Sequence, residues 1–166
     1  MAVLEAIVAG VGAVVDIAEG VQKIGTMLDG QRSVVLVVEN DTRHALERVE
    51  TYHDHGGFKV TPSGRIEPRT VEIFGAQDKG FMTGVEGGAR YRILDGRDDE
   101  ESFAWLTWNN PFVGSNKIGA MAYYDGPPLP PPSTDHLPFP SAYYVVAAVC
   151  GAGDKDAEMR YTIKRR

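Results

Sequence analysis

The sequence predicts a mainly β protein, a single-domain β-sandwich of about ten short strands that follows an N-terminal amphipathic helix. Three observations lead to this fold class. Residues 30–166 contain short segments in which apolar and polar residues alternate, and turn-forming residues separate these segments. Residues 1–29 instead carry apolar residues at helical spacing. The 166 residues are enough for one domain with a sizeable core.

Residues 1–29 predict an amphipathic helix. Apolar residues that step by three or four positions share one helical face. That face carries Leu4, Ile7, Val11, Val14, Ala18, Val21, Ile24 and Leu28. Asp16, Glu19 and Lys23 lie off it. A helix of this length spans roughly 40 Å, more than the hydrocarbon core of a bilayer. It either docks on the protein or exchanges that contact for lipid.

Two other interpretations of this segment fit less well. A secretory signal peptide begins with positive charge, whereas the first basic residue here is Lys23. A conventional transmembrane helix carries its acidic residues outside the apolar run, whereas Asp16 and Glu19 lie inside this one. We therefore expect a soluble amphipathic element without an evident signal peptide.

The rest of the chain predicts strands. The β-branched run of residues 33–38 is typical of a buried strand. Four further strands each present one apolar face, at Val71/Ile73, Phe103/Trp105, Ile118/Ala120/Ala122 and Met159/Tyr161/Ile163. Turns are indicated at residues 55–57, 62–64, 95–96, 125–126 and 151–153. Residues 126–140 hold most of the prolines and predict an extended surface loop.

Charge and cysteine content exclude several function classes. A net charge of −6 argues against nucleic-acid binding, which needs a basic face. A single cysteine, Cys150, excludes an internal disulfide framework and a zinc site made mainly of cysteines. Cys150 lies in an apolar run and is expected to be a packed thiol. The sequence contains no catalytic motif, so we expect neither an enzyme nor a cofactor.

Two polar clusters contain residue types that bind metals, but neither has the spacing of a known metal site. His53 and His55 alternate on a strand, but no further ligands stand at zinc-motif spacing. The acidic run of residues 98–101 matches no calcium loop and is expected to be a solvated turn. We therefore expect no metal site.

Pairs of aromatic residues mark two strands. Trp105 and Trp108 fall on opposite faces of one strand, as do Tyr123 and Tyr124 on another. One member of each pair should therefore point away from the core. An outward aromatic residue suits a membrane interface, a stacked sugar ring or a groove beneath the proline-rich loop, and the sequence leaves these three possibilities open.

Four stretches resemble the actinoporins, pore-forming cytolysins of sea anemones, in the same order along the chain. GQRSVVLVVENDT resembles the family's first strand, and ALERVETYHDHGG resembles the next one, which ends on a Thr-Tyr pair. IFGAQDKGFMTGVEGGARYRI resembles its most recognisable stretch, and GDKDAEMRYTI its closing hairpin. Fungal fruit-body lectins are similar in the sandwich and lack the long insertion helix.

The resemblance implies a phosphocholine site on loops at one end of the sandwich, near His55, Glu86, Thr107, Pro111 and Phe112. Glu86 stands where the family has an aliphatic residue. The tryptophan-rich loop of the family appears here as residues 110–117, which are poorer in aromatic residues, and the proline-rich loop replaces its second helix. The candidate list also includes aromatic residues that could point outward and the tip of the 110–117 loop. The candidate lipid- or glycan-binding residues are therefore His55, Glu86, Thr107, Trp108, Pro111, Phe112, Val113, Tyr123 and Tyr124.

The resemblance implies a pore-forming cytolysin that is secreted as a soluble protein and acts at a target-cell membrane. The protein would bind lipid, self-associate into a ring and insert residues 1–29. Asp16, Glu19 and Lys23 would line a cation-preferring pore. Because of Glu86, we expect no strict dependence on sphingomyelin. The alternative is a lectin-like sandwich that binds a carbohydrate or lipid without forming a pore.

Overall fold

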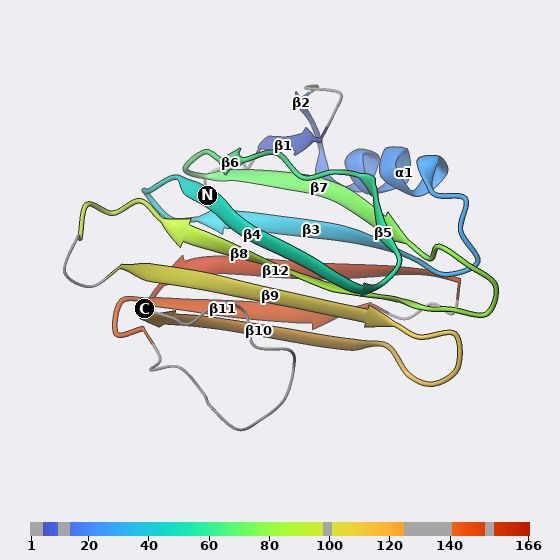
Figure 1. The fold of residues 1–166 in the computed structure, drawn as a ribbon. Coiled ribbons are helices and arrows are strands. Elements are labelled where there is room, and N and C mark those ends of the chain that lie inside the picture. The colour runs from blue at the N-terminus through green and yellow to red at the C-terminus, as the bar shows by residue number, and fades with distance from the viewer. Residues whose placement is uncertain (1–4, 10–13, 98–100, 125–140, 152–154) are drawn as a thin grey trace.

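A computed structural model describes residues 5–9, 14–97, 101–124, 141–151 and 155–166. Two β-sheets face each other, with one helix outside the larger sheet (Figure 1). The elements are β1 (Glu5–Val8), β2 (Val14–Val15), α1 (Ile17–Met27), β3 (Ser33–Asp41), β4 (Leu46–His55), β5 (Gly57–Val60), β6 (Arg65–Ile66), β7 (Thr70–Gln77), β8 (Val85–Ile93), β9 (Ser102–Asn110), β10 (Lys117–Tyr124), β11 (Tyr144–Cys150) and β12 (Asp156–Arg165). The predicted mainly β sandwich is confirmed, and the strands expected at residues 33–38 and around Val71, Phe103, Ile118 and Met159 are present.

The two layers are a seven-stranded sheet and a five-stranded sheet. The seven-stranded sheet, sheet A, has the order β11-β12-β3-β7-β1-β2, and β5 also pairs with β7. The five-stranded sheet, sheet B, has the order β10-β9-β8-β4-β6. Alternate side chains of each strand point between the sheets, which explains the period-two pattern of the sequence.

The core between the sheets is aromatic beneath one end. Trp108 of β9 is only 1% exposed, and its ring lies 6.3 Å from that of Phe74 on β7. Phe58 and His53 complete the cluster, with their ring centroids 4.5 Å apart. Contacts between rings on strands from both sheets therefore hold the two layers together.

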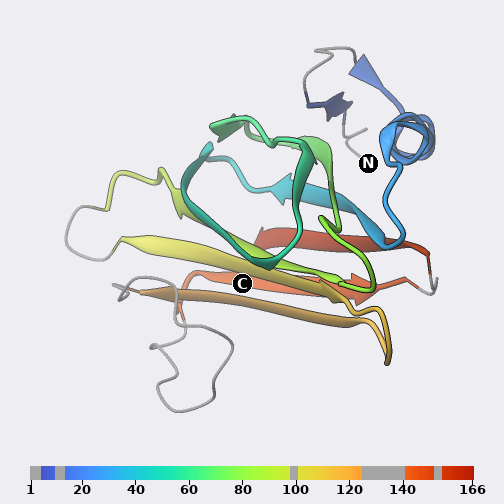
Figure 2. The ribbon, with the colours of Figure 1, turned by 45° about the vertical axis from the view of Figure 1, so that its right-hand side comes forward.

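The N-terminal prediction needs a correction. Residues 1–29 do not form one helix: α1 is an 11-residue helix, and two short strands precede it (Figure 2). β1 pairs in parallel with β7, and Ala6 and Val8 are fully buried. Asp16 caps the helix by accepting a hydrogen bond from the Glu19 N–H at 2.8 Å. Buried residues at period two thus place this stretch in sheet A, although the spacing of its larger residues also fits a helix.

Helix α1 covers the outer face of sheet A. A Cβ added to Gly75 of β7 would lie 2.8 Å from Ile24 and 2.9 Å from Leu28, so these side chains rest directly on the strand. In the part of the chain that the structure describes, no helix is long and apolar enough to cross a membrane.

The strands run the length of the sandwich and create two opposite ends. At one end lie the β7–β8 loop (residues 78–84), the β9–β10 loop (residues 111–116) and the turn after β4. At the other end lie the connection from β3 to β4 and the C-terminus of β12. The proline-rich loop expected at residues 126–140 and the turn at 125–126 lie outside the described residues.

Candidate functional site

Large apolar side chains are exposed to solvent at the end of the sandwich that carries the β7–β8 and β9–β10 loops, here the loop end. Phe81 is 81% exposed and Met82 is 54% exposed, both on the β7–β8 loop. Val113 is 82% exposed on the β9–β10 loop, where Phe112 precedes it. Apolar side chains this exposed on two adjacent loops are typical of a surface that contacts another apolar phase.

The two loops touch because of a glycine. A Cβ on Gly84 would lie 2.7 Å from the Asn110 carbonyl oxygen and 2.7 Å from the Pro111 Cα. Only a residue without a side chain permits that approach. The close contact brings the tips of the β7–β8 and β9–β10 loops together.

Arg32, which directly precedes β3, clamps the second loop. Its Nη2 donates to the Phe112 carbonyl oxygen at 3.1 Å and its Nε donates to the Pro111 carbonyl oxygen at 3.3 Å. The guanidinium also lies 4.9 Å from the centroid of the Phe112 ring. The Asp78 N–H donates to the Arg32 carbonyl oxygen at 2.9 Å, so one short segment holds both loops. The apolar tips therefore project from a braced backbone.

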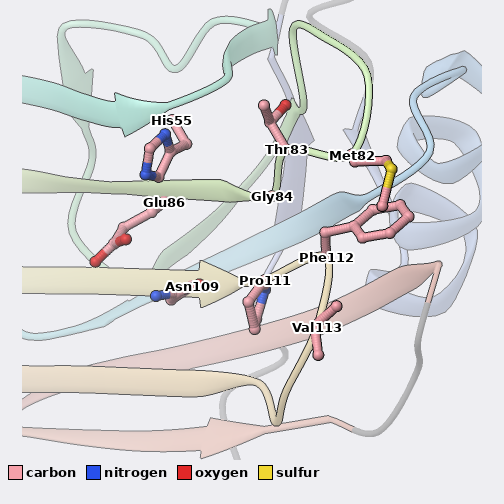
Figure 3. Close-up of a pocket in the computed structure, with 9 residues that line it drawn as sticks. All are labelled: His55, Met82, Thr83, Gly84, Glu86, Asn109, Pro111, Phe112 and Val113. Atoms are coloured by element: carbon pink, nitrogen blue, oxygen red, sulfur yellow. The ribbon is translucent and has the colours of Figure 1, made fainter.

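A cavity of about 320 Å³ opens beside these tips (Figure 3). Its walls are His55, Met82, Thr83, Gly84, Glu86, Asn109, Pro111, Phe112 and Val113. Strand ends of sheet B supply His55, Glu86 and Asn109, and the two loops supply the apolar residues and Thr83. A polar floor next to an apolar rim is thus present at one place on the surface.

A second cavity of about 420 Å³ shares Glu86 and Asn109 with the first. Its other walls are Tyr52, Thr107, Trp108, Lys117, Ile118 and Gly119. Strand register creates this hollow, because Thr107 of β9 stands between Gly88 of β8 and Gly119 of β10. The Tyr52 ring covers Gly88, where an added Cβ would lie 2.4 Å from the ring.

Tyr52 lines the second cavity and carries a buried hydroxyl. Burial, with smaller contributions from Asp54 and Glu86, raises the pKa of Tyr52 to about 12, so its phenol is neutral at physiological pH. Among the described residues its buried hydroxyl has no hydrogen-bond partner. A buried donor left without a partner is costly, and a bound ligand would satisfy it.

The cavities also hold two opposite charges. Glu86 lines both cavities and Lys117 lines the second. Within the described ranges, neither side chain takes part in an ion pair. A carboxylate and an ammonium that are not neutralised by protein suit a ligand carrying both charges.

His53 packs in the aromatic cluster between the sheets. Its ring packs against Phe58 and, at 5.8 Å, against Trp108. Burial and the nearby Lys79 lower the pKa of His53, which favours the neutral ring. Over the described part of the chain, no group of three or more His, Cys, Asp or Glu side chains is placed to hold a metal ion.

The structure gathers most of the sequence-predicted site residues around the two cavities and leaves two apart. His55, Glu86, Pro111, Phe112 and Val113 line the first cavity, and Thr107 lines the second. Trp108 borders the second cavity but is a core residue. Tyr123 and Tyr124 lie at the far end of β10, since that strand starts at Lys117 and runs away from the loops.

The aromatic pairs nevertheless split between faces as predicted. Trp108 is buried and Trp105 is partly exposed on the outer face of sheet B. Tyr123 stacks on Phe103 with ring centroids 5.8 Å apart, and the Tyr124 hydroxyl accepts a hydrogen bond from the Ala142 N–H at 2.7 Å.

Sequence reasoning missed Tyr52, Phe81, Met82, Asn109 and Lys117. Phe81 and Met82 gave a signal, because two large apolar residues follow a charged Lys-Gly turn. The other three are brought to the cavities by cross-strand register, which has no local sequence signal.

The proposed pore-lining residues lie on or beside α1. Asp16 and Glu19 are exposed, and Glu19 pairs with Lys23 at 3.1 Å. Of the expected apolar stripe, Ile24 and Leu28 are buried, Val21 is half-buried and Ala18 is exposed. Ile7 lies on β1 and Val14 on β2, while Leu4 and Val11 fall outside the described residues.

Comparison with known proteins supports the fold more than the sequence family. No family model matches the chain. A protein of Dictyostelium discoideum, described only as uncharacterized, is 27% identical over 90 residues, which cover 54% of this chain. The chain spans only 8% of the length of that relative.

The crystal structure of the lipid-binding protein Nakanori resembles this chain with a TM-score of 0.71 at 17% identity. The match covers 87% of this chain and 76% of the Nakanori chain. A likeness at this identity shows a shared fold, and it agrees with the β-sandwich that the sequence predicts.

Proposed function

We propose that the protein binds membrane lipid through its loop end, with the head group in the two adjoining cavities. The observation that carries this proposal is the position of Phe81, Met82 and Val113, exposed beside a polar cavity that contains Glu86. An apolar rim around a polar pocket matches the chemistry of a lipid, in which a polar head group adjoins apolar chains. The fold shared with a lipid-binding protein supports the proposal.

The charges of the cavities favour a zwitterionic phospholipid head group. Lys117 and the Tyr52 hydroxyl are hydrogen-bond donors that suit a phosphate group. Glu86 is an acceptor that suits an ammonium group. Arg32 already lies over the Phe112 ring, so we assign the ammonium to Glu86 instead of to that ring. A carboxylate acceptor favours an ammonium that can donate hydrogen bonds, as in phosphoethanolamine.

The test is flotation of the protein with vesicles whose head group is varied at fixed chain composition. We expect stronger binding to phosphoethanolamine vesicles than to phosphocholine vesicles, and Glu86→Gln should remove that difference. Loss of the Glu86 charge should weaken ethanolamine binding about tenfold, the usual effect of one charged hydrogen bond. Glu158→Gln, a half-buried acid on β12 that pairs with Arg160 away from the cavities, is the control.

Two results would contradict this assignment. If the wild-type protein binds vesicles equally well whatever the head group, the head group does not occupy the cavities. Saturable binding to free sugars without binding to any vesicle would favour the lectin-like alternative.

A finer proposal is that the lipid-bound protein self-associates into a ring and inserts its N-terminal segment as a cation-preferring pore. An amphipathic α1 with an exposed Glu19–Lys23 face supports this proposal. The 11 residues of α1 span only about 16 Å, about half of a hydrocarbon core. Insertion therefore requires residues of β1 and β2 to leave sheet A and join the helix.

Circular dichroism in the presence of vesicles tests this rearrangement alongside dye release. The pore proposal expects dye release together with a gain in helix content. Lys23→Glu should leave binding unchanged and raise the cation preference of the conductance. Saturated vesicle binding with no dye release would leave a lipid-binding protein and exclude the pore.

A further inference from the structure

The end of the sandwich opposite the loops, here the basic end, carries a cavity that is lined by arginines. Arg43, Arg69 and Arg165 line one cavity of about 240 Å³ together with His44. The remaining walls are Asp41, Thr42 and Tyr144. Among the described residues, three guanidinium groups and one carboxylate line this cavity, which gives it a positive charge although the chain as a whole carries −6.

The positive charge is only partly neutralised by the protein. Arg69 pairs with Asp41. In the described part of the chain, Arg43 and Arg165 have neither an ion pair nor a side-chain hydrogen bond. Like charges around one cavity repel each other, and a bound anion would relieve that repulsion.

Buried hydrogen bonds fix the turn that carries Arg43. The Thr42 hydroxyl donates to the Asn40 side-chain oxygen at 2.7 Å, and the Asn40 amide donates to the His44 carbonyl oxygen at 2.8 Å. Asn40 is fully buried and Thr42 nearly so. These hydrogen bonds fix the backbone on both sides of Arg43 and so fix the position from which its side chain extends.

The opposite walls are held as well. Arg69 has a φ of +60°, a left-handed conformation that is unfavourable for a residue with a side chain and is often found at functional sites. The Tyr144 hydroxyl donates to Asp95 at 2.9 Å. The Arg166 N–H donates to the Tyr143 carbonyl oxygen at 2.9 Å, which fixes the end of β12 directly after Arg165.

We propose that this cavity is an anion site that binds a phosphate or sulfate ester group between Arg43 and Arg165. A guanidinium presents a planar pair of N–H donors that matches the oxygens of a tetrahedral oxyanion. The site lies at the end of the sandwich away from the proposed lipid cavities. It does not depend on them, and a protein bound to a membrane by its loops presents this site to the solution.

Isothermal titration with inorganic phosphate and with sulfate at low ionic strength tests the site, with sodium chloride of equal ionic strength as the reference. Arg43→Ala/Arg165→Ala should weaken binding at least about tenfold, because two charged hydrogen-bond donors are removed. Arg160→Ala/Lys59→Ala removes two positive charges elsewhere and should leave binding unchanged. Melting temperatures of all variants establish that they are folded.

Asp41→Asn gives a test in the opposite direction. This substitution removes the acid that lines the cavity among the described residues and releases Arg69, so it should tighten phosphate binding. If Asp41 only supports the structure of the cavity, Asp41→Asn should weaken or abolish phosphate binding. If Arg43→Ala/Arg165→Ala and the control Arg160→Ala/Lys59→Ala lose phosphate affinity equally, the effect is one of net charge and the proposal is overturned. The absence of saturable phosphate binding in the wild-type protein would also overturn it.

The source of the ester group is distinguished with two probes. A sulfated oligosaccharide and vesicles containing an anionic phospholipid are compared for sensitivity to Arg43→Ala/Arg165→Ala. The position of the site away from the loops predicts that the oligosaccharide depends on these arginines and that the vesicles do not. If neither probe depends on them while inorganic phosphate does, the site takes a small soluble ester.

Discussion

The two ends of the sandwich differ in their interiors as much as in their surfaces. Beneath the apolar loops, Trp108, Phe74 and Phe58 form an aromatic core. Toward the basic end, the interior holds the Glu72 carboxyl and the Tyr91 hydroxyl, both buried. One fold thus combines an end stabilised by ring packing with an end whose interior can change its protonation.

This difference suits different roles. Loops proposed to contact lipid need a rigid base, and packed rings provide it. Charged side chains that hold an anion need a fixed geometry, which buried hydrogen bonds such as Asn40–Thr42 provide. The comparison makes predictions for substitutions in each interior and at the loop tips.

Removing the large ring beneath the loops should have the largest effect. Trp108→Ala should lower the free energy of unfolding by about 3 to 5 kcal/mol, as for other buried aromatic residues. Trp105 lies on the same strand with its side chain on the outer face, so Trp105→Ala should cost much less. Denaturation followed by circular dichroism measures both values, and equal costs would contradict the assignment of Trp108 as the core ring.

The buried carboxyl toward the basic end should give stability a pH dependence. Burial raises the pKa of Glu72 from 4.5 to about 7, opposed by a hydrogen bond from Ser63 and by Arg48. Between these pH values the folded protein keeps a proton that the unfolded chain has released. The contribution of Glu72 to stability is therefore greatest below pH 4.5 and falls as the pH rises through about 7.

Glu72→Gln should remove this dependence, because its amide stays neutral. Relative to the variant, the wild-type protein should lose up to about 3 kcal/mol between pH 4.5 and pH 7. Chemical denaturation at a series of pH values measures the loss, and Glu158→Gln, which removes a half-buried acid paired with Arg160, is the control. Parallel pH profiles for the wild type and Glu72→Gln would show that the carboxyl does not titrate in this range.

The sequence predicted the strands of the sandwich well because their alternating pattern directly reflects burial on one face. It failed at β1 and β2, where Ile7 and Val14 are spaced as in a helix while the burial of Ala6 and Val8 follows a strand. Parallel pairing of β1 with β7 joins segments more than 60 residues apart, and no local pattern reports it.

The candidate site was predictable in its loops and not in its floor. The sequence indicates Phe112 and Val113 because large apolar residues in a turn are kept from the core. In the structure Val113 is exposed, whereas Phe112 packs against Arg32. Tyr52 reaches the cavities through β4, whose register against β8 shifts twice, between Arg48 and Glu50 and between His53 and His55. Such bulges decide which side chains share a face, and the sequence pattern does not place them.

The smallest effect on stability should come from the loop tips, where the effect on function should be clear. Phe81 and Val113 are mostly exposed, so Phe81→Ser/Val113→Ser should leave the melting temperature nearly unchanged. Each side chain would contribute at most roughly 1.5 to 3 kcal/mol if lipid buried it fully, so partial insertion predicts at least about a tenfold loss of vesicle binding. Phe112 is a poorer choice because it packs under Arg32. Val149→Ser, which removes another exposed apolar side chain on β11, is the matched control and should bind vesicles normally. If Phe81→Ser/Val113→Ser binds vesicles as well as the wild type, the membrane contact does not lie at the loop end. The same conclusion follows if Val149→Ser reduces vesicle binding equally.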